Sequence, residues 1–171
     1  MNGGPTPQAA AFAPRLDAVE ARLRRLAAIS PAPAGLTDPD EPSGERWEWG
    51  QVWAHLVEFV PYWCRQIRTV LATLASAAPP FGRVKTDPTR VAAIEADRHR
   101  PPQELFVALA GQLPELRALL DAMSGQDWAR TVGHSTLGTL DMPAVFEMFL
   151  VGHLESHADQ LDGLVAADAR A

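Results

Sequence analysis

The segment VWAHLVEFVPYWCRQIRTVLATL, residues 52–74, carries the most regular apolar pattern in the chain. Its large apolar side chains recur at spacings of 4-3-4-4-3-4, which is the period of one face of an α-helix. They are Val52, Leu56, Phe59, Trp63, Ile67, Val70 and Leu74. This stripe predicts a long core helix at about residues 46–77. Pro61 interrupts the pattern, but the stripe resumes in register, so we expect a kink there and not the end of the helix.

Three further stretches have the same helical period, and they predict helices at about residues 14–29, 102–123 and 141–166. Asp141 has the residue type of an N-cap for the last of these, and Gly125 is expected to end the one before it. A short helix is predicted after Asp87, with Pro88 at its first position. Two long connections, residues 30–45 and 126–140, contain turn residues and are expected to lack regular structure. Strand patterns are almost absent, so the fold class is all-α, a bundle of four long helices.

Composition limits the partners that the chain can have. A net charge of −6 without a basic face disfavours nucleic-acid binding. No apolar run approaches the ~18–20 residues of a membrane span, and the first residues do not resemble a secretory signal, so we expect a cytoplasmic protein. Cys64 is the single cysteine, which excludes an intramolecular disulfide and a multi-cysteine zinc site. We expect one domain at residues 12–167, preceded by a disordered segment at 1–11.

Two histidines occupy positions where an ordinary helix would have leucines. His153 and His157, in GHLESHADQL, lie about 40° apart on a helical wheel, within an apolar stripe. That stripe is formed by Phe146, Phe149, Leu150, Leu161 and Leu164. Imidazoles that face a core lose water, and a shared metal ion would replace that lost interaction. The spacing alone is weak evidence, because separately satisfied histidines often match it by chance.

A third histidine strengthens the hypothesis. His55, in WAHLVEF, lies on the flank of the core stripe of residues 52–74, where a side chain can point into a groove between helices. An isolated histidine there would more often be structural. Together with the pair on the last helix, it makes a site of three histidines the better explanation: His55, His153 and His157.

Other polar residues have weaker claims. Gln160, one turn beyond His157, could orient a ligand imidazole or cap a backbone group. Glu58, one turn after His55, is a candidate base or fourth ligand, although helical glutamates are usually solvated. His99 and His134 are expected to be solvated or capping residues. The five tryptophans could line a pocket but are expected in the core: Trp47, Trp49, Trp53, Trp63 and Trp128.

Three neutral imidazoles leave at least one coordination position of a divalent ion open. An open position is typical of catalytic sites, where the ion lowers the pKa of a bound water or thiol. Imidazole ligation suits zinc, nickel and iron(II) equally.

The combination of WAHLVEF (53–59) with GHLESHADQLDGL (152–164) resembles the DinB/YfiT-like superfamily of metal-binding four-helix bundles. The lead-in HSTLGTLDMPAVF (134–146) is also similar, and the likeness extends over residues 12–166. It implies an up-down-down-up bundle with long crossovers, a metal triad at His55, His153 and His157, and a homodimer. Some members of the family are S-transferases or isomerases that use a low-molecular-weight thiol, and others are described as metal-dependent hydrolases. The C-terminal extension of the maleylpyruvate isomerases is missing, which argues against that reaction.

These observations leave three hypotheses. The first is a cytoplasmic metalloenzyme that transfers or hydrolyses a small molecule, with the metal activating a low-molecular-weight thiol or a water. The second is a stress-related binding protein whose metal is structural or sensory. The third is an interaction module whose histidines bind no metal.

Overall fold

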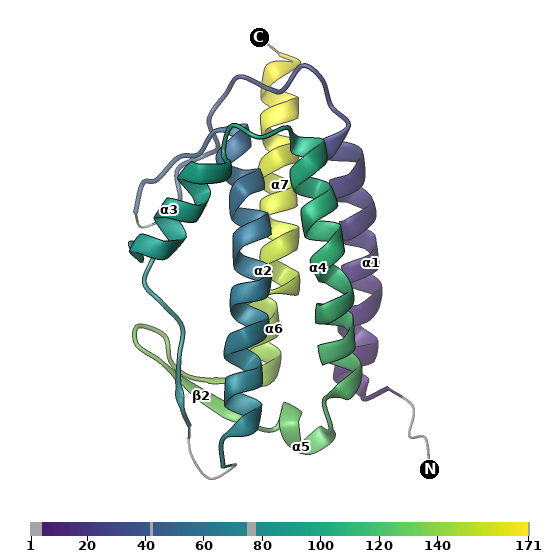
Figure 1. Ribbon diagram of the computed structural model, residues 1–171, viewed down its shortest axis with the longest axis vertical. Helices are drawn as coiled ribbons and strands as arrows, with labels where there is room; N and C mark the ends of the chain where they lie inside the picture. Colours follow the sequence, from purple (N-terminus) through teal and green to yellow (C-terminus); the bar gives the residue numbers. More distant parts are fainter. Residues whose placement is uncertain (1–4, 42, 75–77, 171) are drawn as a thin grey trace.

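Four long helices packed side by side form the protein, as the computed structural model shows for residues 5–41, 43–74 and 78–170 (Figure 1). They are α1 (Pro7–Ala27), α2 (Trp49–Ala72), α4 (Pro102–Ala122) and a last helix in two parts, α6 (Met142–Phe149) and α7 (Val151–Asp168). In Figure 1 α1 rises, α2 and α4 descend, and α6 and α7 rise again. Both α1 and α2 pack against α4 and α7. The expected up-down-down-up four-helix bundle is therefore confirmed.

The stripe of residues 52–74 forms the core side of α2. Val52, Leu56 and Phe59 are fully buried, and α2 continues through Pro61 without ending. The helix ends at Ala72, earlier than predicted, and Leu74 is 83% exposed. Arg130 explains this end, because its guanidinium donates hydrogen bonds to the backbone carbonyls of Val70 and Thr73. The last residues of the predicted helix, 75–77, lie outside the described residues.

The first helix begins earlier than the sequence pattern indicated. The hydroxyl of Thr6 accepts a hydrogen bond from the backbone amide of Ala9, and Pro7 occupies the first helical position. Residues 7–11, expected to be disordered, are therefore helical; residues 1–4 lie outside the described part of the chain. Burial of Ala9 and Phe12 in the core explains the extension.

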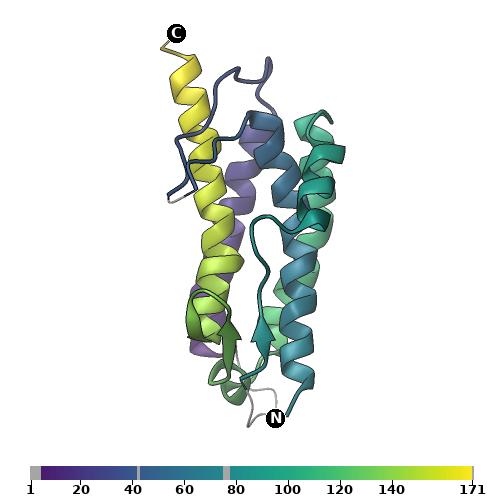
Figure 2. The same cartoon turned by 90° about the vertical axis from the view of Figure 1, so that its left-hand side faces the viewer.

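The expectation of irregular structure at residues 126–140 was wrong. Gly125 begins the short helix α5 (Gly125–Trp128) instead of ending α4, because Ser124 and Asp127 cap each other's backbone amides. The strands β2 (Thr131–His134) and β3 (Gly138–Asp141) then form an antiparallel pair, and β1 (Pro80–Phe81) adds in parallel to β2. Figure 2 shows this small sheet at the lower end of the bundle, between α2 and α6. Strands of two to four residues are too short to give an alternating pattern.

Two N-caps agree with the sequence prediction. Asp87 accepts a hydrogen bond from the backbone amide of Arg90 and begins α3 (Pro88–Asp97). Asp141 caps α6 in the same way, through the amide of Ala144. Among the helices of the described ranges, none is both long enough and apolar enough to cross a membrane.

The last helix is broken at Leu150, which the sequence did not predict. Leu150 has φ −129° and ψ −92°, outside the helical region. Next to this break the backbone carbonyl of Glu147 lies so near Gly152 that a Cβ atom there would be 2.3 Å from it. Arg15 spans the break, because its guanidinium binds Glu147 of α6 and Glu155 of α7. His153 consequently lies in the first turn of α7.

Candidate metal centre

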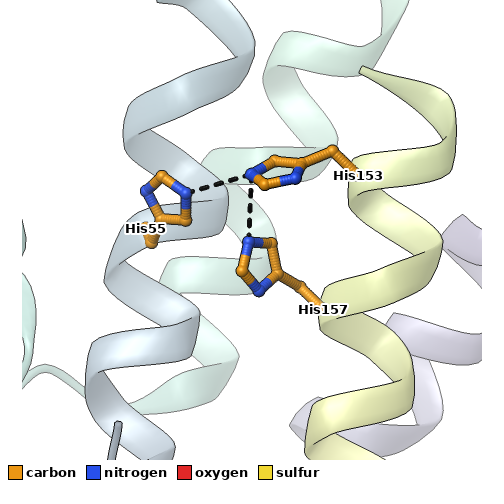
Figure 3. A group of neighbouring side chains, drawn as sticks. All are labelled: His55, His153 and His157. Carbon is orange, nitrogen blue, oxygen red and sulfur yellow. Dashed lines mark hydrogen bonds between the residues drawn. The ribbon is translucent and has the colours of Figure 1, made fainter. Parts of the chain in front are cut away.

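Three histidines from two helices meet in the interior of the bundle (Figure 3). His55 projects from α2, and His153 and His157 project from α7 toward it. The Nε2 atom of His153 is 3.2 Å from that of His55 and 3.1 Å from that of His157. One ligand atom from each ring lies within 4.8 Å of the others. Donor atoms bound tetrahedrally at zinc–nitrogen lengths of 2.0–2.1 Å would be about 3.3 Å apart, so the observed spacing suits one shared ion.

All three imidazoles are held in the neutral form. His55 and His157 are 4% and 6% exposed. Burial lowers the pKa of His157 to about 4, despite its hydrogen bond to Gln160. Burial and the neighbouring cationic groups also hold the pKa of His55 and of His153 well below its ordinary value. Neutral imidazole is the form that binds a metal, because a ring nitrogen then keeps its lone pair.

Gln160 fixes which nitrogen of His157 keeps the lone pair. Its Oε1 atom lies 2.7 Å from Nδ1 of His157. A carbonyl oxygen can only accept, so Nδ1 carries the hydrogen and Nε2 presents its lone pair to the other rings. The position predicted for Gln160 as a neighbour of the histidines agrees with this contact.

Glu58 lies on the opposite side of His55. Its Oε2 atom is 3.4 Å from Nδ1 of His55, without the alignment of a hydrogen bond. The same carboxylate makes two bonds of 2.5 Å with the guanidinium of Arg83, which stacks on Tyr62. A carboxylate behind Nδ1 favours a hydrogen on that atom and therefore a lone pair on Nε2. Glu58 is directed away from the other histidines and is not arranged as a fourth ligand.

The Nε2 atom of His153 lies close to the Nε2 atoms of both other histidines, and this arrangement favours a bound cation. A hydrogen on the Nε2 atom of His153 can align with only one of the two neighbouring nitrogens. The other pair of nitrogens would then face each other about 3 Å apart without an aligned hydrogen bond. A metal ion accepts all three lone pairs at once, so the residues present fit a metal.

Trp47 forms one wall of the site. Its ring stacks on that of His157 at a centroid distance of 5.8 Å and meets the ring of His55 edge-on at 5.0 Å. A cavity of about 70 Å³ lies against these rings, with room for a few water molecules or one small chemical group. The wall on the far side of the histidines is polar and consists of Thr37, Asp40, Glu45, Lys85 and Arg90.

Sequence reasoning missed these polar residues. They belong to the 30–45 connection and to α3 with the segment before it, which looked like solvated loop and an ordinary short helix. Only the fold brings them to the histidines. A charged residue on the apolar side of a short helix, such as Arg90, was the one signal that could have indicated a pocket.

The remaining candidates are structural, as expected. Nδ1 of His134 accepts hydrogen bonds from the backbone amides of Thr136 and Leu137, and its ring stacks on Phe149. His99 lies in an exposed turn after α3. Cys64 is fully buried, and burial raises the pKa of its thiol to about 11, so it is not a nucleophile. All five tryptophans are at most 8% exposed, and among them Trp47 also lines the cavity.

Comparison with known proteins identifies the family of the chain. The family model of the DinB superfamily matches residues 10–161. The chain belongs to the DinB superfamily. No curated protein matches it.

Solved structures share the fold of this DinB-superfamily chain at low identity. YfiT from Bacillus subtilis, described as a probable metal-dependent hydrolase with an unusual four-helix bundle topology, superposes with a TM-score of 0.72 at 17% identity, covering 98% of this chain and 91% of its own. A mycothiol-dependent maleylpyruvate isomerase superposes with a TM-score of 0.62 at 15% identity, over 88% of this chain and 60% of its own. A protein from Clostridium difficile 630 has a TM-score of 0.63 at 10% identity, over 94% and 97%. These likenesses concern the fold.

Proposed function

We propose that this DinB-superfamily protein binds one divalent metal ion through His55, His153 and His157 and uses it in the chemistry of a small molecule. The observation that carries the proposal is the convergence of three neutral imidazoles, two of them buried and that of His153 partly exposed, beside a cavity. The Nε2 atom of His153 lies 3.2 and 3.1 Å from those of His55 and His157. Imidazole ligands fit zinc, nickel or iron(II). When bound, such an ion would lower the pKa of a thiol or water at its open position.

The reaction that we favour is transfer of a low-molecular-weight thiol, with hydrolysis as the alternative. The family supports both, because one solved neighbour is mycothiol-dependent and another is described as a probable metal-dependent hydrolase. The residues of this chain contribute in distinct ways. Gln160 and Glu58 orient the histidine rings, Trp47 excludes water from one side, and the polar wall contacts the rest of the substrate.

A second candidate function is binding without turnover, in which the metal is structural or sensory. The small volume of the cavity, about 70 Å³, favours it because few substrates would fit without movement of the 30–45 connection. The two functions differ in whether a coordination position is open to ligands.

Cobalt substitution separates these two functions. If the site is open, adding 2-mercaptoethanol to the cobalt-loaded protein gives a thiolate-to-cobalt absorption band, and azide changes the visible spectrum. The same additions to a His153→Ala variant give neither change. If neither thiol nor azide alters the spectrum of the loaded protein, an open catalytic position is contradicted.

We also propose that the protein acts in the cytoplasm as a homodimer, as its resemblance to the family implies. Sedimentation velocity at micromolar concentration is expected to give twice the 18.5 kDa chain mass. A single species at the chain mass would contradict the dimer and leave the metal site unaffected.

A further inference from the structure

Arg90 is a buried cation in the wall of the same cavity. It projects from α3, is 8% exposed, and places its guanidinium 5.2 Å from the centre of the Trp47 ring. Its Nη1 atom donates a hydrogen bond of 2.7 Å to the backbone carbonyl of Lys85. Arg90 thus contacts the tryptophan that also stacks on His157.

The charge of Arg90 is not matched by a carboxylate within ion-pair distance among the residues that the structure describes. Other arginines of the bundle differ: Arg15 and Arg83, for example, bind Glu147 and Glu58 directly. Burial without such a partner lowers the pKa of Arg90, and Nη1 is its one side-chain nitrogen with a hydrogen bond in the described ranges. Neither its Nε nor its Nη2 atom is fully enclosed, so their donors stay accessible to a ligand in the cavity.

The nearby acids do not fill this role. Asp40 is bound by Lys85 and by the hydroxyl of Ser43. Glu45 lies on the exposed side of the cavity and attracts Arg90 only from a distance. Arg90 lines the same cavity as His55, His153 and His157. The free donors of Arg90 therefore share the cavity with the histidine cluster.

We propose that Arg90 binds the carboxylate of a small-molecule substrate whose opposite end reaches the three-histidine centre. A guanidinium presents parallel donors that match the two oxygens of a carboxylate. One unpaired arginine in a cavity of about 70 Å³ suits a planar monoanion better than a bulkier phosphate, which would need further free cations. This inference rests on the proposed function, because the metal anchors the other end of the substrate.

Two thiols of nearly equal size test the inference on the cobalt-loaded protein. We expect 3-mercaptopropionate to bind about tenfold more tightly than 3-mercaptopropan-1-ol, with both affinities measured from the thiolate-to-cobalt band. A tenfold difference in affinity corresponds to the energy of a charge-assisted hydrogen bond. In Arg90→Gln this preference is expected to fall below about twofold, and Arg90→Lys should keep part of it. Arg24→Gln is the matched control, because Arg24 carries the same charge but lies outside the cavity, where it is paired with Glu20 and 67% exposed; the preference should persist there. Equal affinities of the two thiols for the unaltered protein would overturn the inference, whether or not the variants fold.

A second arm uses metal-free protein and does not depend on the proposed function. Propionate is added while the side-chain Nε–H signal of Arg90, assigned by its loss in Arg90→Lys, is followed by ¹⁵N NMR. A saturable shift of that signal supports the carboxylate site. If the protein also proved unable to retain a metal, that result would refute the proposed function but not the carboxylate site. Propionate without effect, together with equal thiol affinities, refutes the carboxylate site while leaving the metal centre in place.

Discussion

At the scale of single residues, the account depends on how the three imidazoles are oriented. Gln160 fixes the hydrogen of His157 on Nδ1 through a contact of 2.7 Å. His55 has a carboxylate, that of Glu58, on its far side. Such supporting contacts keep the lone pairs of Nε2 directed at one point, which is what a metal site requires.

Replacing Gln160 by Leu is expected to weaken metal binding about 10- to 100-fold, because His157 loses the partner that fixes its tautomer. Competition with a chromophoric chelator measures the change. Gln103→Leu, on the exposed side of α4, is the control and should leave the affinity unchanged. Unaltered affinity in Gln160→Leu would show that the contact has no part in metal binding.

Acidification is expected to destabilise the metal-free protein. The pKa of His157 is about 4 in the fold and 6.5 when unfolded, so the unfolded chain binds more protons between these values. Stability is therefore full above pH 6.5 and falls as the pH drops toward 4, by on the order of 3 kcal/mol from this residue alone. Urea unfolding at several pH values measures it, and His157→Asn should flatten the dependence. An equal slope in both proteins would contradict the burial of a neutral imidazole.

The candidate ligands could be predicted from the sequence, but their surroundings could not. His153 and His157 were visible because two polar residues interrupt an apolar stripe, and His55 because it flanks another. Arg90 and Trp47 reach the cavity through the path of the 30–45 connection and the docking of α3, which no local pattern specifies. Residues that gather from separate loops are set by tertiary packing, so a helical wheel does not reveal them.

At the scale of elements, the break between α6 and α7 sets the position of His153. The four core helices followed from periodicity, and the N-caps of α3 at Asp87 and of α6 at Asp141 followed from residue type. The break did not, because Leu150 continues the apolar stripe and only the close approach of Glu147 to Gly152 distinguishes the junction. The short strands escaped prediction for a similar reason, since two to four residues carry no period.

Two glycines of α7 give a matched test of that junction. Gly152→Ala would bring a Cβ atom to 2.3 Å from the backbone carbonyl of Glu147, so we expect a loss of about 2 kcal/mol and weaker metal binding. At Gly163 no atom lies within 4 Å of the added Cβ, and Gly163→Ala is expected to stabilise the helix by about 0.5–1 kcal/mol. Thermal unfolding measures both. Equal effects would contradict the close approach at the break.

At the scale of the whole molecule, a bound metal would join α2 to α7 across 98 residues of sequence. An ion that binds the folded chain and not the unfolded chain shifts the folding equilibrium. At a free metal concentration about a thousand times the Kd the gain is about 4 kcal/mol, and removal by a chelator should lower the Tm by about 10 °C. Calorimetry with and without the chelator measures this difference. If the chelator left the Tm of the metal-loaded protein unchanged, the claim that the metal stabilises the fold by joining α2 to α7 would be contradicted.

The most direct test of the central claim is the metal content of the protein purified without a histidine tag, measured by mass spectrometry. The account predicts close to one divalent ion per chain, lost in His153→Ala and retained in His134→Ala, because His134 lies outside the cluster and caps a turn. Metal-free protein that also fails to take up zinc, nickel or iron(II) would contradict it, as would a His153→Ala variant that keeps its ion.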